Sequence, residues 1–111
     1  MKTINVGDEF SASLTNRDNL QRDGKFSGVE FREQFLTELD NGDSWKNDDQ
    51  YVILDFSDVK RLGPSWANEV FAYFTQYGKP DVILKKINLQ NISRVKLAII
   101  KQEIETGYSK N

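Results

Sequence analysis

The chain of 111 residues contains no cysteine and no histidine. Without cysteine it has no disulfide framework, thiolate metal site or thiol nucleophile, and without histidine it lacks the commonest general base and the commonest metal ligand. Long apolar runs are also missing, and residues 1–10 lack the basic start and apolar stretch of a secretory signal. These absences predict a non-enzymatic cytoplasmic domain with no metal, no cofactor and no membrane contact.

The charged residues are too evenly balanced to indicate a nucleic acid as the partner. The 15 basic and 17 acidic side chains give a formal charge of −2, whereas binding to a polyanion needs an excess of positive charge. The hydrophobic content of 38% is that of an ordinary globular protein, and a chain of this length builds one core. We therefore expect one domain over residues 1–107, followed by a polar tail at 108–111.

The first fifteen residues alternate between apolar and polar side chains on both sides of a Gly7-Asp8 turn. Such alternation around a turn predicts an N-terminal hairpin with one buried face. The polar stretch 16–25 that follows predicts a surface loop. The apolar positions of the hairpin are Ile4, Val6, Phe10, Ala12 and Leu14.

A first helix is predicted over residues 27–40. Ser27 and Glu30 have the spacing of a capping box, and Phe26 and Phe31 occupy the two positions of a hydrophobic staple. After a polar loop at 43–50, residues 51–56 are apolar at nearly every position, which is typical of a central strand covered on both faces.

The second half of the chain predicts a helix, a strand and a last helix. Gly63 and Pro64 open the first of these, which reaches Tyr77 before Gly78 and Pro80 end it. A strand at about 81–89 and a last helix capped by Asn91 follow. Strands joined by helices require parallel crossovers, so the fold class is α/β. The last helix buries a stripe consisting of Ile92, Val95, Ile99, Ile100 and Ile104.

Segments 26–32, 52–59 and 64–71 together resemble, in their order and spacing, the STAS-like domains of the DUF4325 group. The resemblance implies a single small mixed β-sheet with helices packed largely on one face, used as a regulatory protein interaction module. It also implies a histidine-kinase-like ATPase or an anti-sigma kinase as the partner, because related anti-sigma-factor antagonists bind such proteins. In those antagonists the helix after the central strand begins with a phosphorylatable serine or threonine.

Ser65 is the candidate phosphosite that this resemblance implies. The chain departs from the antagonist pattern, in which an acidic residue, two hydroxyl residues and a glycine follow one another. Gly63 stands at the acidic position, Pro64 at one hydroxyl position and Trp66 at the glycine. Ser65 is therefore either a phosphosite or simply the N-cap of its helix, and the residues favour the cap. The candidate partner-binding residues are Leu62, Gly63, Pro64, Ser65, Trp66 and Glu69.

Other residues leave a choice between a structural and a functional role. Trp66 is either a core anchor, which we favour, or an interface anchor beside Leu62. Asp55 is interpreted as a hydrogen-bond acceptor that orients the loop after its strand. Residues 40–43 and 48–49 lack the ligand order of a calcium loop and predict a solvated loop. A solvated helix face accounts for Lys85, Lys86, Arg94, Lys96 and Lys101.

Two alternative functions stay open. The first is a constitutive scaffold or oligomerisation domain without phosphoregulation, which the Gly63-Pro64 departure supports. The second is catalysis by carboxylates such as Asp55 and Asp58, although a chain without histidine and cysteine has few groups to assist them.

Overall fold

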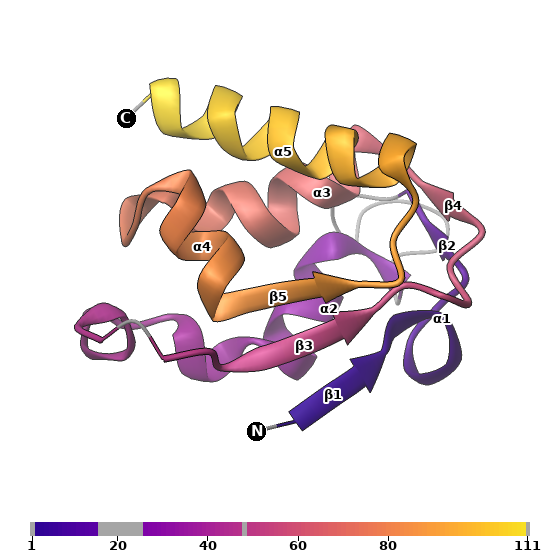
Figure 1. Ribbon diagram of the computed structural model, residues 1–111, viewed down its shortest axis with the longest axis horizontal. Coiled ribbons are helices and arrows are strands. Elements are labelled where there is room, and N and C mark those ends of the chain that lie inside the picture. The colour runs from indigo at the N-terminus through magenta and orange to yellow at the C-terminus, as the bar shows by residue number, and fades with distance from the viewer. Residues whose placement is uncertain (1, 16–25, 48, 111) are drawn as a thin grey trace.

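Three parallel strands form the central sheet of the computed structural model, which describes residues 2–15, 26–47 and 49–110. The strands are β1 (Lys2–Asn5), β3 (Val52–Asp55) and β5 (Ile87–Gln90), and β3 lies between the other two (Figure 1). The predicted central strand and the predicted α/β class are therefore confirmed.

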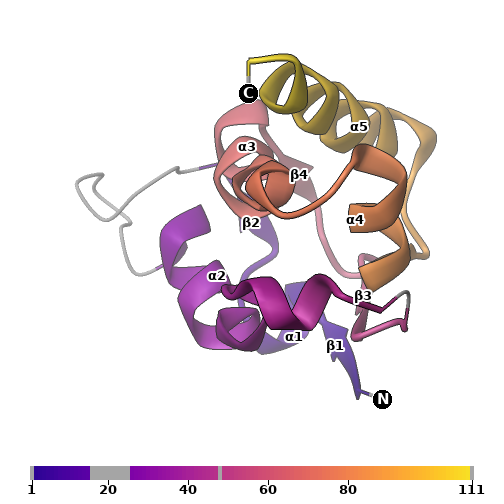
Figure 2. The same ribbon diagram turned by 90° about the vertical axis from the view of Figure 1, so that its left-hand side faces the viewer.

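Only one face of this sheet is covered by the core. Burial alternates along β3: Val52 and Leu54 are fully buried, whereas Ile53 and Asp55 are only half-buried. In Figures 1 and 2 the long helices lie to one side of the sheet. The apolar run of this strand had predicted cover on both faces, and that prediction is wrong. The helices do lie largely on one face, as the resemblance implied.

The predicted N-terminal hairpin is wrong, because its two arms do not pair with each other. The first arm, β1, pairs with β3, and the second contributes β2 (Ser13–Leu14), which pairs with β4 (Arg61–Leu62). The predicted turn forms the short helix α1 (Val6–Glu9), capped by the side chain of Asn5. Every described strand pair is parallel, so the sheet is not mixed. Apolar–polar alternation predicts that a segment is a strand, but it does not determine which other strand that segment pairs with.

The capping signal at Ser27 is confirmed. Helix α2 (Gly28–Phe35) begins directly after Ser27, whose Oγ accepts a hydrogen bond from the backbone N–H of Glu30 at 3.1 Å. The helix is shorter than the predicted range 27–40, because Leu36 leaves helical geometry with φ −122° and ψ 13°. A 3₁₀ turn, η2 (Thr37–Leu39), continues the chain.

The predicted second helix is present and changes its winding near its middle. Helix α3 (Pro64–Phe71) is followed by the 3₁₀ helix η4 (Ala72–Gln76). Another 3₁₀ helix, η3 (Gly42–Trp45), occupies the start of the region predicted as a polar loop at 43–50. The Trp45 ring stacks on Tyr77 with centroids 6.0 Å apart and so attaches that region to the end of η4.

The strand predicted at 81–89 is wrong over most of its length. Helix α4 (Pro80–Lys86) occupies its first part, and only the four residues of β5 are extended. Pro80 is the first residue of α4, a position where the missing N–H of proline costs nothing. Asp81 in the first turn and lysines in the last turn also match the helix dipole.

The last helix begins later and ends later than predicted. Helix α5 (Arg94–Ser109) is capped by Ser93. Asn91, the predicted cap, instead adopts a left-handed turn with φ 53°. Gly107 lies within the helix, and the first two residues of the predicted tail 108–111 are helical.

Helix α3 is the centre of the core and packs against both α2 and α5 (Figure 1). Among the described residues, no helix is long and apolar enough to cross a membrane. The predicted surface loop 16–25 lies outside the described residues. The largest fully buried side chains of the described residues include those of Phe31, Trp66, Phe71, Phe74, Ile100 and Ile104.

Candidate functional site

The start of α3 is held in place by backbone hydrogen bonds to the small β2–β4 sheet. Gly63 N–H donates to the Leu14 carbonyl at 2.8 Å, and the Gly63 carbonyl accepts from the backbone N–H of Ala67 at 3.2 Å. Gly63 is therefore the N-cap, and Pro64 is the first residue of the helix. Within the described part of the chain, no side chain caps α3.

Ser65 is not the helix cap, so the structural role favoured for it is wrong. It is the second helical residue, because Pro64 with its fixed φ already belongs to the helix. Its side chain is exposed to solvent in the first turn. Unpaired backbone N–H groups and the helix dipole favour negative charge at such a position.

Trp66 belongs to the core, as favoured, and is not an exposed interface anchor. Its side chain is fully buried and lies 5.1 Å from the ring of Phe31 on α2 and 6.2 Å from that of Phe71. The buried indole N–H has no hydrogen-bond partner among the described residues. Trp66 therefore drops out of the candidate partner-binding surface.

Glu69 and Leu62 are also engaged within the domain. The Glu69 carboxylate binds the Arg32 guanidinium at 2.8 Å, with the two side chains 20% and 11% exposed. Leu62 is half-buried and packs against the core. Of the six predicted residues, Pro64 and Ser65 are exposed, and Gly63 directly before them is half-buried.

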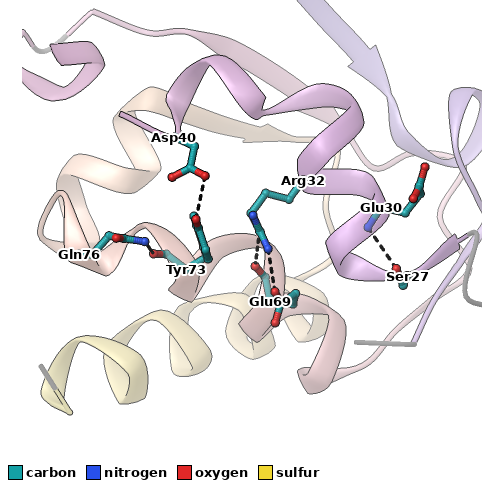
Figure 3. A network of polar contacts seen from close by, with 7 residues as sticks. All are labelled: Ser27, Glu30, Arg32, Asp40, Glu69, Tyr73 and Gln76. Atoms are coloured by element: carbon teal, nitrogen blue, oxygen red, sulfur yellow. Dashed lines mark hydrogen bonds and ion pairs between the residues drawn. The ribbon is translucent and has the colours of Figure 1, made fainter. Parts of the chain in front are cut away.

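The Arg32–Glu69 ion pair is one end of a network that sequence analysis missed (Figure 3). The Arg32 guanidinium stacks on the ring of Tyr73, 3.6 Å from its centroid. The hydroxyl of Tyr73 donates to Asp40 at 2.8 Å, and that of Tyr77 donates to the other carboxylate oxygen at 2.7 Å. The network thus joins α2 and the end of η2 to α3 and η4.

The network also changes the acidity of its members. The hydrogen bonds from Tyr77 and Tyr73 lower the pKa of Asp40 below its ordinary value of 3.8. Those same bonds raise the pKa of both tyrosines. No pattern in the sequence indicated that these residues contact one another.

A shallow apolar groove begins at Pro64, the chain neighbour of Ser65. It is formed by Pro64 together with one stripe of α5 and has a volume of about 500 Å³. Val95 lies on this stripe and is 71% exposed, so its predicted place in the buried face is wrong. Exposed large apolar side chains in a connected patch are typical of interaction sites. The α5 residues of the groove are Val95, Ala98, Ile99, Gln102 and Glu103.

The carboxylates considered for catalysis each have a structural partner. Asp55 accepts hydrogen bonds from the backbone N–H of Ser57 at 2.9 Å and from the Asn91 amide at 3.2 Å. The interaction with Ser57, followed by that with Asn91, lowers the pKa of Asp55. Asp58 accepts from the Asn5 amide at 2.8 Å. The predicted loop-orienting role of Asp55 is confirmed.

The acidic segments form no metal site within the described ranges. No group of three or more acidic side chains there is arranged to hold a metal ion. Asp40 is instead bound by two tyrosine hydroxyls, and Asn41 caps η3 by accepting from the Ser44 N–H at 3.0 Å. Among the predicted basic residues Lys86 is an exception, because its side chain is buried rather than solvated.

A one-sided parallel sheet, with an exposed serine at the start of the helix that follows its central strand, defines a small STAS-like α/β domain. The chain belongs to the family described as STAS-like domain of unknown function (DUF4325), whose model matches residues 27–96. The match runs from the cap of α2 to the first turn of α5 and includes β3, α3 and β5. In the other two comparisons, the chain matched no curated protein and no solved structure.

Proposed function

We propose that this STAS-like domain is a non-enzymatic regulatory module that binds a kinase or ATPase-type protein through the start of α3. The observation that carries the proposal is the exposure of Ser65 next to the apolar groove. The contact surface then comprises Gly63, Pro64 and Ser65 together with the α5 stripe around Val95. The cytoplasm stays the predicted location.

Phosphorylation of Ser65 would regulate this contact. The Ser65 hydroxyl oxygen forms a bond to the γ-phosphorus of ATP, ADP leaves, and the hydroxyl proton passes to a base of the kinase. The helix N-terminus tolerates the new charge locally. A partner whose apolar surface covers the groove would have to bury that charge, which is costly without a counter-ion. Phosphorylation therefore weakens the complex.

The proposal is tested with five immobilised baits: the wild type, Ser65→Ala, Ser65→Asp, Val95→Glu and Ser109→Asp. Ser109 is an exposed serine at the far end of α5 and provides a matched charge control. We expect the wild type, Ser65→Ala and Ser109→Asp to capture a protein identified by mass spectrometry as an ATPase or kinase. Ser65→Asp and Val95→Glu should lose it while keeping the wild-type circular dichroism spectrum.

A second step tests the chemistry. The captured protein is purified and incubated with ATP and the domain, and the phosphorylated residue is located by mass spectrometry. Phosphate on Ser65 supports regulation at this position. Equal capture by all five baits would contradict both the proposed contact surface and its regulation by phosphorylation of Ser65.

The alternative is a constitutive scaffold or oligomerisation domain. The observation in its favour is the Gly63-Pro64 sequence, which replaces the acidic and hydroxyl residues of the antagonists. In that case Val95→Glu abolishes binding or self-association, and Ser65→Asp does not. Sedimentation velocity of the wild type and Val95→Glu identifies a second copy of the chain as the partner.

A further inference from the structure

Lys86 is the one charged side chain buried within the described residues. It is 3% exposed and is the last residue of α4, directly before β5. Lys85, its neighbour, is in the same last helical turn and is exposed. The helix dipole acts on both lysines and so does not explain why only one is buried. Burying an ammonium group is costly unless an acceptor or a counter-ion compensates it.

The protein supplies only part of that compensation. Lys86 Nζ donates one hydrogen bond, to Asn47 Oδ1 at 2.7 Å. Among the described residues, no carboxylate lies within 4.0 Å of Nζ, and Nζ forms no other hydrogen bond there. An ammonium group has three N–H donors. Two donors of a buried cation thus have no acceptor in the described part of the chain.

Lys86 and Asn47 line the same cavity, which lies at the amino ends of β3 and β5. Its volume is about 240 Å³, whereas one water occupies about 30 Å³ in the liquid. Tyr51, directly before β3, lines it as well, and its backbone N–H donates to the Lys86 carbonyl at 2.9 Å. The remaining wall residues are Leu39, Ser44, Asp49 and Gln50.

The wall offers mainly neutral groups beside the buried cation. Ser44, Asn47 and Gln50 bring hydroxyl and amide groups. Burial, followed by a hydrogen bond with Glu38, raises the pKa of Tyr51 to about 12, so this phenol stays neutral at physiological pH. Among the described wall residues Asp49 is the one carboxylate, and it is exposed. The buried charge of the cavity is therefore positive.

We propose that this cavity is a binding site for a small oxyanion, a phosphate or carboxylate group, held by the ammonium of Lys86. An oxyanion accepts the donors that Asn47 leaves unused and neutralises the buried charge. Asp49 at the rim favours an anion that also carries a hydrogen-bond donor, such as hydrogen phosphate. The site lies at the opposite end of β3 from α3, so it is independent of the proposed partner surface.

The test is a thermal unfolding series in potassium phosphate, acetate or chloride at one ionic strength. The variants are the wild type, Lys86→Met, Asn47→Asp and the matched control Lys85→Met. Lys86→Met removes the charge while keeping the length of the side chain. Asn47→Asp places a carboxylate beside Nζ, which competes with the ligand. An anion at ten times its Kd should raise the Tm of the wild type and Lys85→Met by about 4 °C or more.

Neither Lys86→Met nor Asn47→Asp should show this rise. A ¹⁵N spectrum provides a second readout, in which phosphate or acetate shifts the side-chain amide signals of Asn47 and Gln50 in the wild type and in Lys85→Met, whereas the same signals stay in place in Lys86→Met. A response to phosphate alone or to acetate alone identifies the class of oxyanion. The inference fails if no variant responds to either anion, if chloride acts equally, or if Lys86→Met and Asn47→Asp respond like the wild type.

Discussion

The two sides of α3 differ in how completely the domain covers them. Toward α2 the helix is sealed, because Trp66 is fully buried against Phe31 and Glu69 is ion-paired with Arg32. Toward the start of α5 it is open, and Pro64 and the 71% exposed Val95 border a groove. One side of the helix thus contributes to the core, and the other side borders the proposed contact surface. We call these the closed side and the open side.

The largest difference should appear when one apolar side chain on each side is shortened. Trp66→Ala on the closed side should lower the free energy of unfolding by about 3–5 kcal/mol, because it leaves a cavity beside Phe31. Val95→Ala on the open side should change it by no more than about 0.5 kcal/mol. Urea unfolding followed by circular dichroism measures both. A similar loss for the two variants would mean that the open side is part of the core.

The far end of α5, unlike its start, packs closely against η4. A Cβ atom added at Gly107 would lie 2.8 Å from the Cβ of Ala72. Gly107→Ala should therefore cost about 1–2 kcal/mol, since the overpacking exceeds the gain in helix propensity. Adding Ala72→Gly should remove most of this penalty in a double-mutant cycle. As a control, Gly42→Ala has no neighbouring atom within 4 Å and should be nearly neutral.

The contribution of the polar network to the free energy of unfolding should depend on pH. Asp40→Asn should reduce stability at pH 7 by about 0.5–1 kcal/mol, a small loss because the carboxylate is exposed. The pKa of Asp40 is lowered in the folded state, so its contribution is complete above the ordinary value of 3.8. This stabilising contribution is lost as the pH falls through the pKa that Asp40 has in the folded state, which is below 3.8.

Unfolding curves between pH 2 and pH 7 test this prediction. The difference between the wild type and Asp40→Asn should shrink below about pH 4. The control is Asp43→Asn, because Asp43 is highly exposed and its one ion pair among the described residues is with Lys46, three positions on, at 3.0 Å. A difference that stays constant down to pH 2 would mean that Asp40 does not act through its charge.

The smallest expected effect is at the cap of α3, where the two sides meet. Gly63 has φ −107°, and a Cβ there would have its nearest neighbour at 3.7 Å. Gly63→Ser should therefore fit and stabilise the domain by about 0.5 kcal/mol. Gly63→Ala separates the two causes, because it restricts the unfolded chain without adding a cap. If Gly63→Ser and Gly63→Ala raise the Tm by the same amount, the serine side chain forms no capping hydrogen bond.

Local signals predicted the elements better than the site. The Ser27 cap and the central strand were read correctly because each depends on residues within one or two turns of chain. The position of Ser65 was misjudged by two residues, since Ser65 was taken as the cap of the helix, whereas the cap is Gly63. The network of Arg32, Tyr73 and Asp40 had no sequence signal, because its members are spread over more than thirty residues.

By itself, the sequence determined the α/β class, the order of strand, helix and strand around Val52–Asp55, and the absence of cysteine and histidine chemistry. The tertiary structure alone decided that β1 pairs with β3 instead of closing a hairpin, that Val95 is exposed, and that Lys86 is buried beside Asn47. Capping and periodicity act between residues close in the chain. Pairing and burial depend on which distant segments meet, and the pattern of a single segment does not contain that information.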